Sequence, residues 1–174
     1  MWSDEYSVER GLGKQQEWCF CTPAEKWDPK NVQIYKCGKE LRVMVWACFW
    51  GRGRTPLYLM DRDFEAKKHG YSANSYLEVL DNIVMPAWER IDDSEYIFMQ
   101  DNAAIYTAYK VRDWFRDNEI VVIDWPPYSP DLNPIKHAWK KLKEMLYKYF
   151  PEVSNATGKS EKDIERIGSA LQAC

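Results

Sequence analysis

The chain has 174 residues, of which 45% are hydrophobic and 15% aromatic, and a formal net charge of −3 at pH 7. This length and hydrophobic content predict a single domain with a full core and exclude an intrinsically disordered chain. Neither a run of ~20 apolar residues nor a secretory leader is present, so we expect a protein that is neither secreted nor embedded in a membrane. The five cysteines show no zinc-type pairing, which indicates free thiols in a reducing compartment.

The N-terminal part of the chain predicts strands. Residues 1–8 form the first, and the two-residue period of a strand divides its side chains between two faces. Trp2, Asp4 and Tyr6 share one face, and Ser3, Glu5 and Ser7 share the other. A short strand at residues 17–22 follows.

The clearest strand pattern covers residues 40–50. A glycine-rich turn joins it to residues 56–61, which predicts a hairpin. Arg52 and Arg54 lie in this turn. They are candidates for binding DNA phosphates, although exposed turns often carry charge for solubility alone.

Two further strands are expected in the second half of the chain. A helix capped by Ser72 precedes the first of them and is interrupted by Pro86. The strand at residues 96–101 is apolar and ends at Asp101, and the next, at 120–124, follows a helix. Alternating strands and helices imply parallel pairing with right-handed crossovers.

A proline-punctuated loop leads into the next helix, which covers residues 134–149. Asn133 is a good N-cap, Pro134 suits the first helical position, and Lys136 then falls at the third. A cation in the first turn opposes the helix dipole, which suggests that the position suits an acid.

Lysines are the main charged residues of this helix. Between positions 136 and 148 there are five of them, at 136, 140, 141, 143 and 148, and a single acid, Glu144. They form either a solvated helix face or a track for the DNA backbone, for which Lys140, Lys141 and Lys143 are the candidates. The negative net charge is unusual for a protein that binds DNA without the help of another domain. A last helix is expected after Ser160.

Three segments of the sequence together resemble the catalytic blocks of mariner-type transposases. They are Trp2-Ser3-Asp4-Glu5, Gln100-Asp101-Asn102, and Ser129-Pro130-Asp131-Leu132-Asn133-Pro134-Ile135 followed by His137-Ala138-Trp139. The resemblance implies an α/β, ribonuclease H-like fold with a mixed five-stranded sheet, its first three strands antiparallel and its later ones parallel, flanked by helices. Residues 1–151 would be the catalytic core, and residues 152–174 a linker and short helix of the same domain.

The family cuts and joins DNA with an Asp, Asp and Glu (or Asp) triad that holds Mg²⁺ or Mn²⁺. The resemblance places the first two acids at Asp4 and Asp101, the residues expected to bind the metal. The third position falls on Lys136, with 34 residues between it and Asp101, the spacing that the family uses. A lysine has no lone pair to offer a metal, so we expect weakened metal binding and impaired activity.

Electrostatics indicates how large this impairment is. Two unit charges 4 Å apart interact by about 4 kcal/mol at an effective dielectric near 20, and a divalent ion feels roughly twice that repulsion. A loss of ~4 kcal/mol in transition-state stabilisation is about a thousandfold in rate.

Three functional hypotheses stay open at this point. The chain is a DNA-strand-transferring domain with reduced activity, an inactive domesticated module that binds DNA or a protein partner, or an α/β domain with ordinary strand-end acids. The resemblance also implies a nuclear protein whose DNA contacts depend on an N-terminal helix-turn-helix region in a longer chain, and a possible homodimer.

Overall fold

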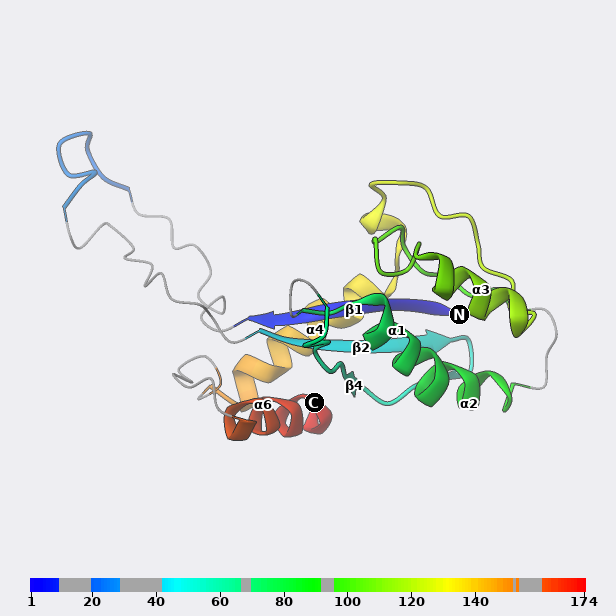
Figure 1. Ribbon diagram of the computed structural model, residues 1–174. Coiled ribbons are helices and arrows are strands. Elements are labelled where there is room, and N and C mark those ends of the chain that lie inside the picture. The colour runs from blue at the N-terminus through cyan, green and yellow to red at the C-terminus, as the bar shows by residue number, and fades with distance from the viewer. Residues whose placement is uncertain (10–19, 29–41, 67–69, 92–95, 152, 154–160) are drawn as a thin grey trace.

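The computed structural model describes residues 1–9, 20–28, 42–66, 70–91, 96–151, 153 and 161–174 (Figure 1). Its centre is a pair of long antiparallel strands, β1 (Trp2–Glu9) and β2 (Arg42–Trp50). Two short strands, β3 (Gly53–Arg54) and β4 (Tyr58–Leu59), also pair with β2 in antiparallel orientation. The expected hairpin after residue 50 is therefore present.

The other edge of β1 carries a shorter, parallel connection. Trp2 forms a parallel bridge with Met99, and Phe98 forms another with Val122. We expected full strands at 96–101 and 120–124, but these bridges are isolated. The antiparallel half of the predicted sheet is thus present, whereas five strands with a parallel half are not established.

One continuous helical stretch follows the sheet and consists of α1 (Ala73–Val79), η1 (Leu80–Val84) and α2 (Met85–Trp88). Ser72 caps it as expected, because its Oγ accepts a hydrogen bond of 2.9 Å from the Asn74 N–H. The middle segment η1 is a π-helical turn. Its wider hydrogen-bond spacing accommodates the proline at position 86, so the helical stretch continues through this residue instead of ending there.

Helices cover both faces of the sheet. Tyr76 of α1 and Phe115 of α3 (Tyr109–Asp117) pack with Trp46 in one buried cluster. On the other face, α4 (Ile135–Tyr149) and α6 (Glu161–Ala173) share a second cluster with β2. Figure 1 shows α1 in front of the two long strands and α4 crossing behind them. Asp4 lies on the face that α4 covers.

The C-terminal helix is part of this packing. Ile167, Ala170 and Leu171 of α6 are buried against Trp139 and Leu146 of α4. Among the described helices, none combines the length and the apolar character needed to cross a bilayer. The Ser160 cap lies outside the described residues, as do residues 17–19 of the strand expected at 17–22. The described residues 20–22 are not in a strand, so for them this prediction is wrong.

Candidate active site

The two aspartates expected to act together lie at matching positions on neighbouring segments. The parallel bridge joins Trp2 to Met99, so Asp4 and Asp101 each follow two residues further along. The Ser3 N–H and Oγ both donate to the Met99 carbonyl oxygen, at 3.2 and 2.6 Å. These contacts fix the register of the two segments and bring both acids to the same edge of the sheet.

Asp4 is bound by two donors from α4. Lys136 Nζ lies 2.6 Å from Asp4 Oδ2, and Trp139 Nε1 donates to the same oxygen at 2.8 Å. The Asp4 side chain is 2% exposed, while that of Lys136 is 40% exposed. The lysine therefore reaches from the rim of the site to a carboxylate at its base.

The electrostatic setting of Asp4 is a balance of opposing effects. Burial raises the pKa of Asp4, and the ion pair with Lys136 and the hydrogen bond from Trp139 lower it in part. The nearby charge of Asp101 raises this pKa further. The net direction is upward, so burial and Asp101 together outweigh the two donors.

Asn133 fixes the start of α4 against β1. Its Nδ2 donates to the Ser3 carbonyl oxygen at 3.1 Å, and its Oδ1 accepts from the Ile135 N–H at 3.3 Å. We expected Asn133 to be the N-cap, but the structure places Pro134 there, so that α4 begins at Ile135. A short 3₁₀ turn at Pro130–Leu132 precedes the helix and shifts its start by one residue.

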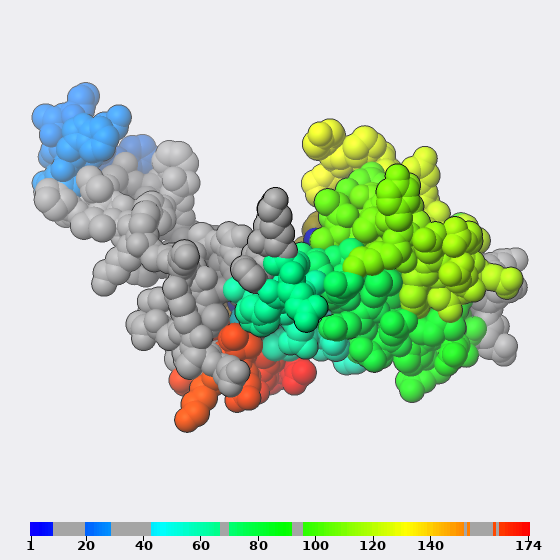
Figure 2. All heavy atoms as spheres, viewed as in Figure 1, coloured from blue at the N-terminus to red at the C-terminus, as the bar shows by residue number. Residues whose placement is uncertain are grey.

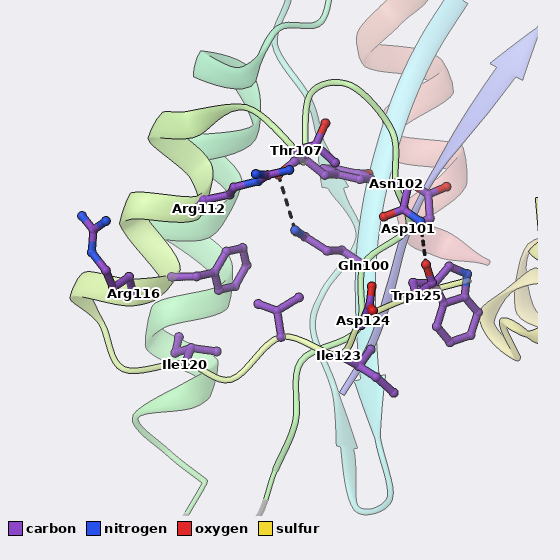
Figure 3. A pocket seen from close by; sticks show the side chains of 13 residues that line it. Gln100, Asp101, Asn102, Thr107, Arg112, Arg116, Ile120, Ile123, Asp124 and Trp125 are labelled. Atoms are coloured by element: carbon purple, nitrogen blue, oxygen red, sulfur yellow. Dashed lines mark hydrogen bonds between the residues drawn. The ribbon is translucent and has the colours of Figure 1, made fainter. Parts of the chain in front are cut away.

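The other side of the site is formed by the residues that follow Met99. Asp101 Oδ1 accepts from the Ala103 N–H at 2.8 Å, and Asn102 Nδ2 donates to the Trp125 carbonyl oxygen at 2.6 Å (Figure 3). A cavity of about 380 Å³ lies between these residues and α4. Asp101, Asn102, Trp125, Asn133 and Lys136 are among its lining residues.

A second carboxyl group, that of the half-buried Glu5, lies on the opposite face of β1 and was not foreseen from the sequence. Tyr106 OH donates to Glu5, and Tyr76 OH donates to Gln100 Oε1 at 2.8 Å. The two tyrosine rings pack with their centroids 4.3 Å apart. Burial raises the pKa of Glu5, and the hydrogen bond from Tyr106 lowers it in part.

The cations expected to bind DNA lie away from Asp4. Lys140 and Lys141 are exposed on α4, and Lys141 forms a 3.5 Å ion pair with Glu144. Arg54 and Lys141 both line a groove of about 550 Å³ between β2, α4 and α6. Arg52 is exposed in the turn after β2, and Lys143 is half-buried on α4. Their role in DNA binding stays a prediction.

The residues present do not fit a two-metal centre. Within the described part of the chain, no three His, Cys, Asp or Glu side chains are grouped so that they could hold a metal ion. Asp4 Oδ2 already accepts two N–H bonds, and the Lys136 ammonium has no lone pair. Asp4 and Asp101 keep the frame of such a centre, but the position between them and α4 carries a positive charge.

Comparison with known proteins decides the family. The profile of the DDE superfamily endonucleases matches residues 60–156, more than half of the chain. The chain belongs to this family. The matched region contains Asp101 and Lys136 but not Asp4, whose place in the site depends on the geometry described above.

The relatives of this DDE endonuclease domain are transposases. The chain is 36% identical over 155 residues to the Tcb1 transposase of Caenorhabditis briggsae and 30% identical over 154 residues to the Tc1 transposase of Caenorhabditis elegans. Each match covers 84% of this chain and 51% of the relative. The chain therefore spans about half the length of these relatives. The expected kinship with mariner-type transposases is confirmed at the family level.

A solved structure supports the fold. The Mos1 transposase, in a paired-end complex with the left transposon end, aligns with 98% of this chain at a TM-score of 0.59 and 18% identity. The alignment covers 54% of the Mos1 chain. At this identity the likeness shows the fold alone, and it agrees with the expected ribonuclease H-like class.

Proposed function

We propose that this chain is the catalytic domain of a Tc1/mariner-type transposase whose metal-dependent DNA cleavage and strand transfer are impaired by Lys136. The observation that carries the proposal is the 2.6 Å ion pair between Lys136 Nζ and Asp4 Oδ2. An ammonium group already neutralises the carboxylate that would have to bind a cation. A divalent ion must displace this lysine and then tolerate its charge nearby.

The chemistry of the reaction explains why this position matters. In-line attack on a phosphodiester builds up charge on the attacking and leaving oxygens, which two metal ions held by carboxylates can stabilise. The Mos1 catalytic domain has been solved with Mg and with Mn. In the present chain, Asp101 remains as a carboxylate at the cavity, while Asp4 is held by Lys136 and Trp139.

The alternative of an inactive module that binds DNA or a protein partner narrows here to one partner. The ion pair equally favours a second function, in which the domain keeps its fold and binds DNA without cutting it. The two proposals differ only in whether DNA cleavage persists. In both, Lys136 compensates the charge of the buried Asp4, so the lysine stabilises the fold at the position where catalysis needs an acid.

DNA is the partner that we propose in either case. The Mos1 transposase was solved as a paired-end complex with a transposon end. By analogy, we propose DNA contacts through Lys140, Lys141, Lys143, Arg52 and Arg54, aided by a helix-turn-helix region outside this sequence. Homodimerisation and a nuclear location belong to the same proposal.

Metal binding by a Lys136→Glu variant tests this function. The substitution removes the competing ammonium and adds a carboxylate at the start of α4. Titration calorimetry with Mn²⁺ should show a new or at least about tenfold tighter site in the variant, because one hard oxygen ligand is gained and one repulsive charge is lost. Lys140→Glu, one turn further along the exposed side of α4, makes the same charge change away from Asp4 and should leave Mn²⁺ binding unchanged.

Equal Mn²⁺ affinity before and after Lys136→Glu would contradict the proposed role of Lys136. An equal gain in both variants would show that only the overall charge matters. Circular dichroism spectra that match the parent chain are the check that each variant is folded.

A further inference from the structure

A second pocket adjoins the candidate site. It lies between α3 and the two chain segments that end near Asp101 and Asp124, and its volume is about 380 Å³ (Figure 3). We call it the α3 pocket. Its apolar floor is formed by Phe115, Ile120 and Val122. This volume lies within the usual range of small-ligand pockets.

The α3 pocket shares three lining residues with the cavity of the candidate site. Asp101, Asn102 and Trp125 line both cavities. A strand that passes over Asp101 would therefore meet the α3 pocket next. Nothing in the proposed chemistry at Asp4 makes use of this second cavity.

Arg112 and Arg116, one helical turn apart on α3, differ in the direction of their side chains at the pocket. Figure 3 shows the Arg112 guanidinium turned into the pocket beside Thr107, while Arg116 points away from it. Arg116 pairs with Asp113 at 2.7 Å and with Asp117 at 3.1 Å. Within the described residues, Arg112 forms no ion pair, so its charge is available to a ligand.

The remaining polar groups narrow the class of ligand. Gln100 is already engaged at both ends, by Tyr76 OH and by the Tyr106 carbonyl oxygen. Arg112 and the exposed carboxylate of Asp124 are left at the opening. A bare anion would be attracted by the arginine but repelled by the carboxylates. A nucleotide carries an anionic phosphate for Arg112, an apolar ring face for the apolar lining residues, and N–H donors for the Asp124 carboxylate.

We infer that the α3 pocket holds one nucleotide of a DNA strand that leaves the candidate site at Asp101. Arg112 pairs with the phosphate, the floor at Phe115 and Val122 receives the base, and Asp124 accepts from the exocyclic amine of the base. The inference rests on the proposed DNA-processing function, because it takes DNA as the ligand. It requires no metal ion and no cleavage.

Fluorescence anisotropy with a labelled single-stranded oligonucleotide, in EDTA at low salt, tests the inference on the intact chain. Arg112→Ala should weaken binding by about tenfold, because a charge-assisted phosphate contact is lost. It should also reduce the slope of log K against log salt by about 0.7, the value for one phosphate contact on a single strand. Arg116→Ala is the matched control and should change affinity by less than about twofold, since its charge is already paired at the surface.

Two further ligands divide the binding energy into its parts. An abasic oligonucleotide measures the contribution of the base, and a free nucleotide measures the contribution of the rest of the strand. An oligonucleotide with abasic sites should bind the parent chain about tenfold more weakly, because base stacking is lost. A free deoxynucleoside monophosphate should compete only at much higher concentration, because it makes one phosphate contact instead of several. Asp124→Ala should reduce the ratio of affinities for the normal and the abasic oligonucleotide, because the acceptor for the exocyclic amine is lost, whereas the lost repulsion of the phosphate affects both strands alike.

Several outcomes would overturn the inference. The parent chain could fail to bind single-stranded DNA, Arg112→Ala and Arg116→Ala could lose the same affinity for the oligonucleotide, or normal and abasic strands could bind equally tightly. Equal affinity for the mononucleotide would overturn its assignment to a strand. The proposed function has its own test, which is Mn²⁺ binding by Lys136→Glu. The result of that test does not depend on these oligonucleotide measurements, so the two proposals can fail independently.

Discussion

Each face of β1 carries one of two carboxyl groups that are neighbours in the sequence, and their hydrogen-bond partners differ. Asp4 faces α4 and is held by the Lys136 ammonium and the Trp139 indole N–H. Glu5 faces α3 and is held by the Tyr106 hydroxyl in an apolar cluster. Burial raises the pKa of both groups. The two groups share a strand and the direction of the pKa shift. They differ in exposure, since Asp4 is buried and Glu5 half-buried, and in the charge of their partner.

The charge of the partner defines the role of Lys136. A neutral hydroxyl satisfies Glu5 in either protonation state, so Glu5 can be protonated without losing its partner. Asp4 loses its ion pair when it is protonated and keeps a buried, uncompensated charge when Lys136 is removed. The α4 face therefore depends on electrostatic compensation, and any cation that binds there has to compete with the lysine.

The largest expected effect is on catalysis by Lys136→Glu. If the ammonium blocks metal binding at Asp4, the substitution should raise the rate of Mn²⁺-dependent nicking of supercoiled plasmid by about two to three orders of magnitude. The measurement compares the chain, Lys136→Glu and the control Lys140→Glu at equal concentration. A parent chain that already nicks as fast as Lys136→Glu would show that the lysine does not limit the reaction.

The next effect is on stability, through Lys136→Met, which keeps the length of the side chain and removes its charge. At neutral pH the buried Asp4 carboxylate loses its cation, so the free energy of unfolding should fall by about 1–3 kcal/mol. The loss should shrink as the pH falls through the raised pKa of Asp4 in the folded chain, because Asp4 is then protonated in both the parent chain and the variant.

Urea unfolding of Lys136→Met at several pH values measures this effect. Lys141→Met is the control, because Lys141 and Glu144 are 71% and 55% exposed and form only a surface ion pair. Its removal should cost less than about 0.5 kcal/mol. Equal losses in the two variants, or a loss independent of pH, would contradict compensation of Asp4 by Lys136.

The smallest effect is expected on the opposite face, for Glu5→Gln. Because the pKa of Glu5 is raised in the folded chain, the folded state binds more protons than the unfolded state above about pH 4.3, the ordinary Glu pKa. Stability from this group is therefore present below that pH and is lost as the pH rises through the folded pKa. The amide keeps an acceptor for Tyr106 and removes this loss.

Glu5→Gln should therefore be at least as stable as the parent chain at pH 7, by about 1.4 kcal/mol for each unit by which the pKa is raised. Urea unfolding between pH 4 and 7 provides the measurement, and the advantage should disappear at the acid end. A variant less stable at pH 7 than at pH 4, relative to the parent, would show that Glu5 is needed as a charged group.

Much of the site follows from local sequence patterns. The two-residue period places Asp4 on a different face from Glu5, and the end of an apolar run places Asp101 at the sheet edge. Lys136 joins them only through the resemblance to mariner-type transposases, because local patterns place it at the start of a helix and no further. These inferences work because strand alternation and helix starts are set by neighbouring residues.

The remaining features depend on residues far apart in the chain. Trp139 has the spacing of a core residue, and only the docking of α4 on β1 turns its indole N–H toward Asp4. The contact between Glu5 and Tyr106 joins residues 101 positions apart, and no local pattern indicates it. The start of α4 at Ile135 follows a 3₁₀ turn at Pro130–Leu132, and Asn133 joins this helix start to the Ser3 carbonyl oxygen of β1, a contact between residues 130 positions apart.

The most direct measurement is a crystal structure of the chain soaked in Mn²⁺, with anomalous scattering collected at the manganese edge. Lys136 Nζ should remain on Asp4 Oδ2, and no manganese peak should lie between Asp4 and Asp101. A manganese ion bound to both aspartates, with Lys136 turned away from them, would contradict the claim that the lysine has replaced metal binding at this site.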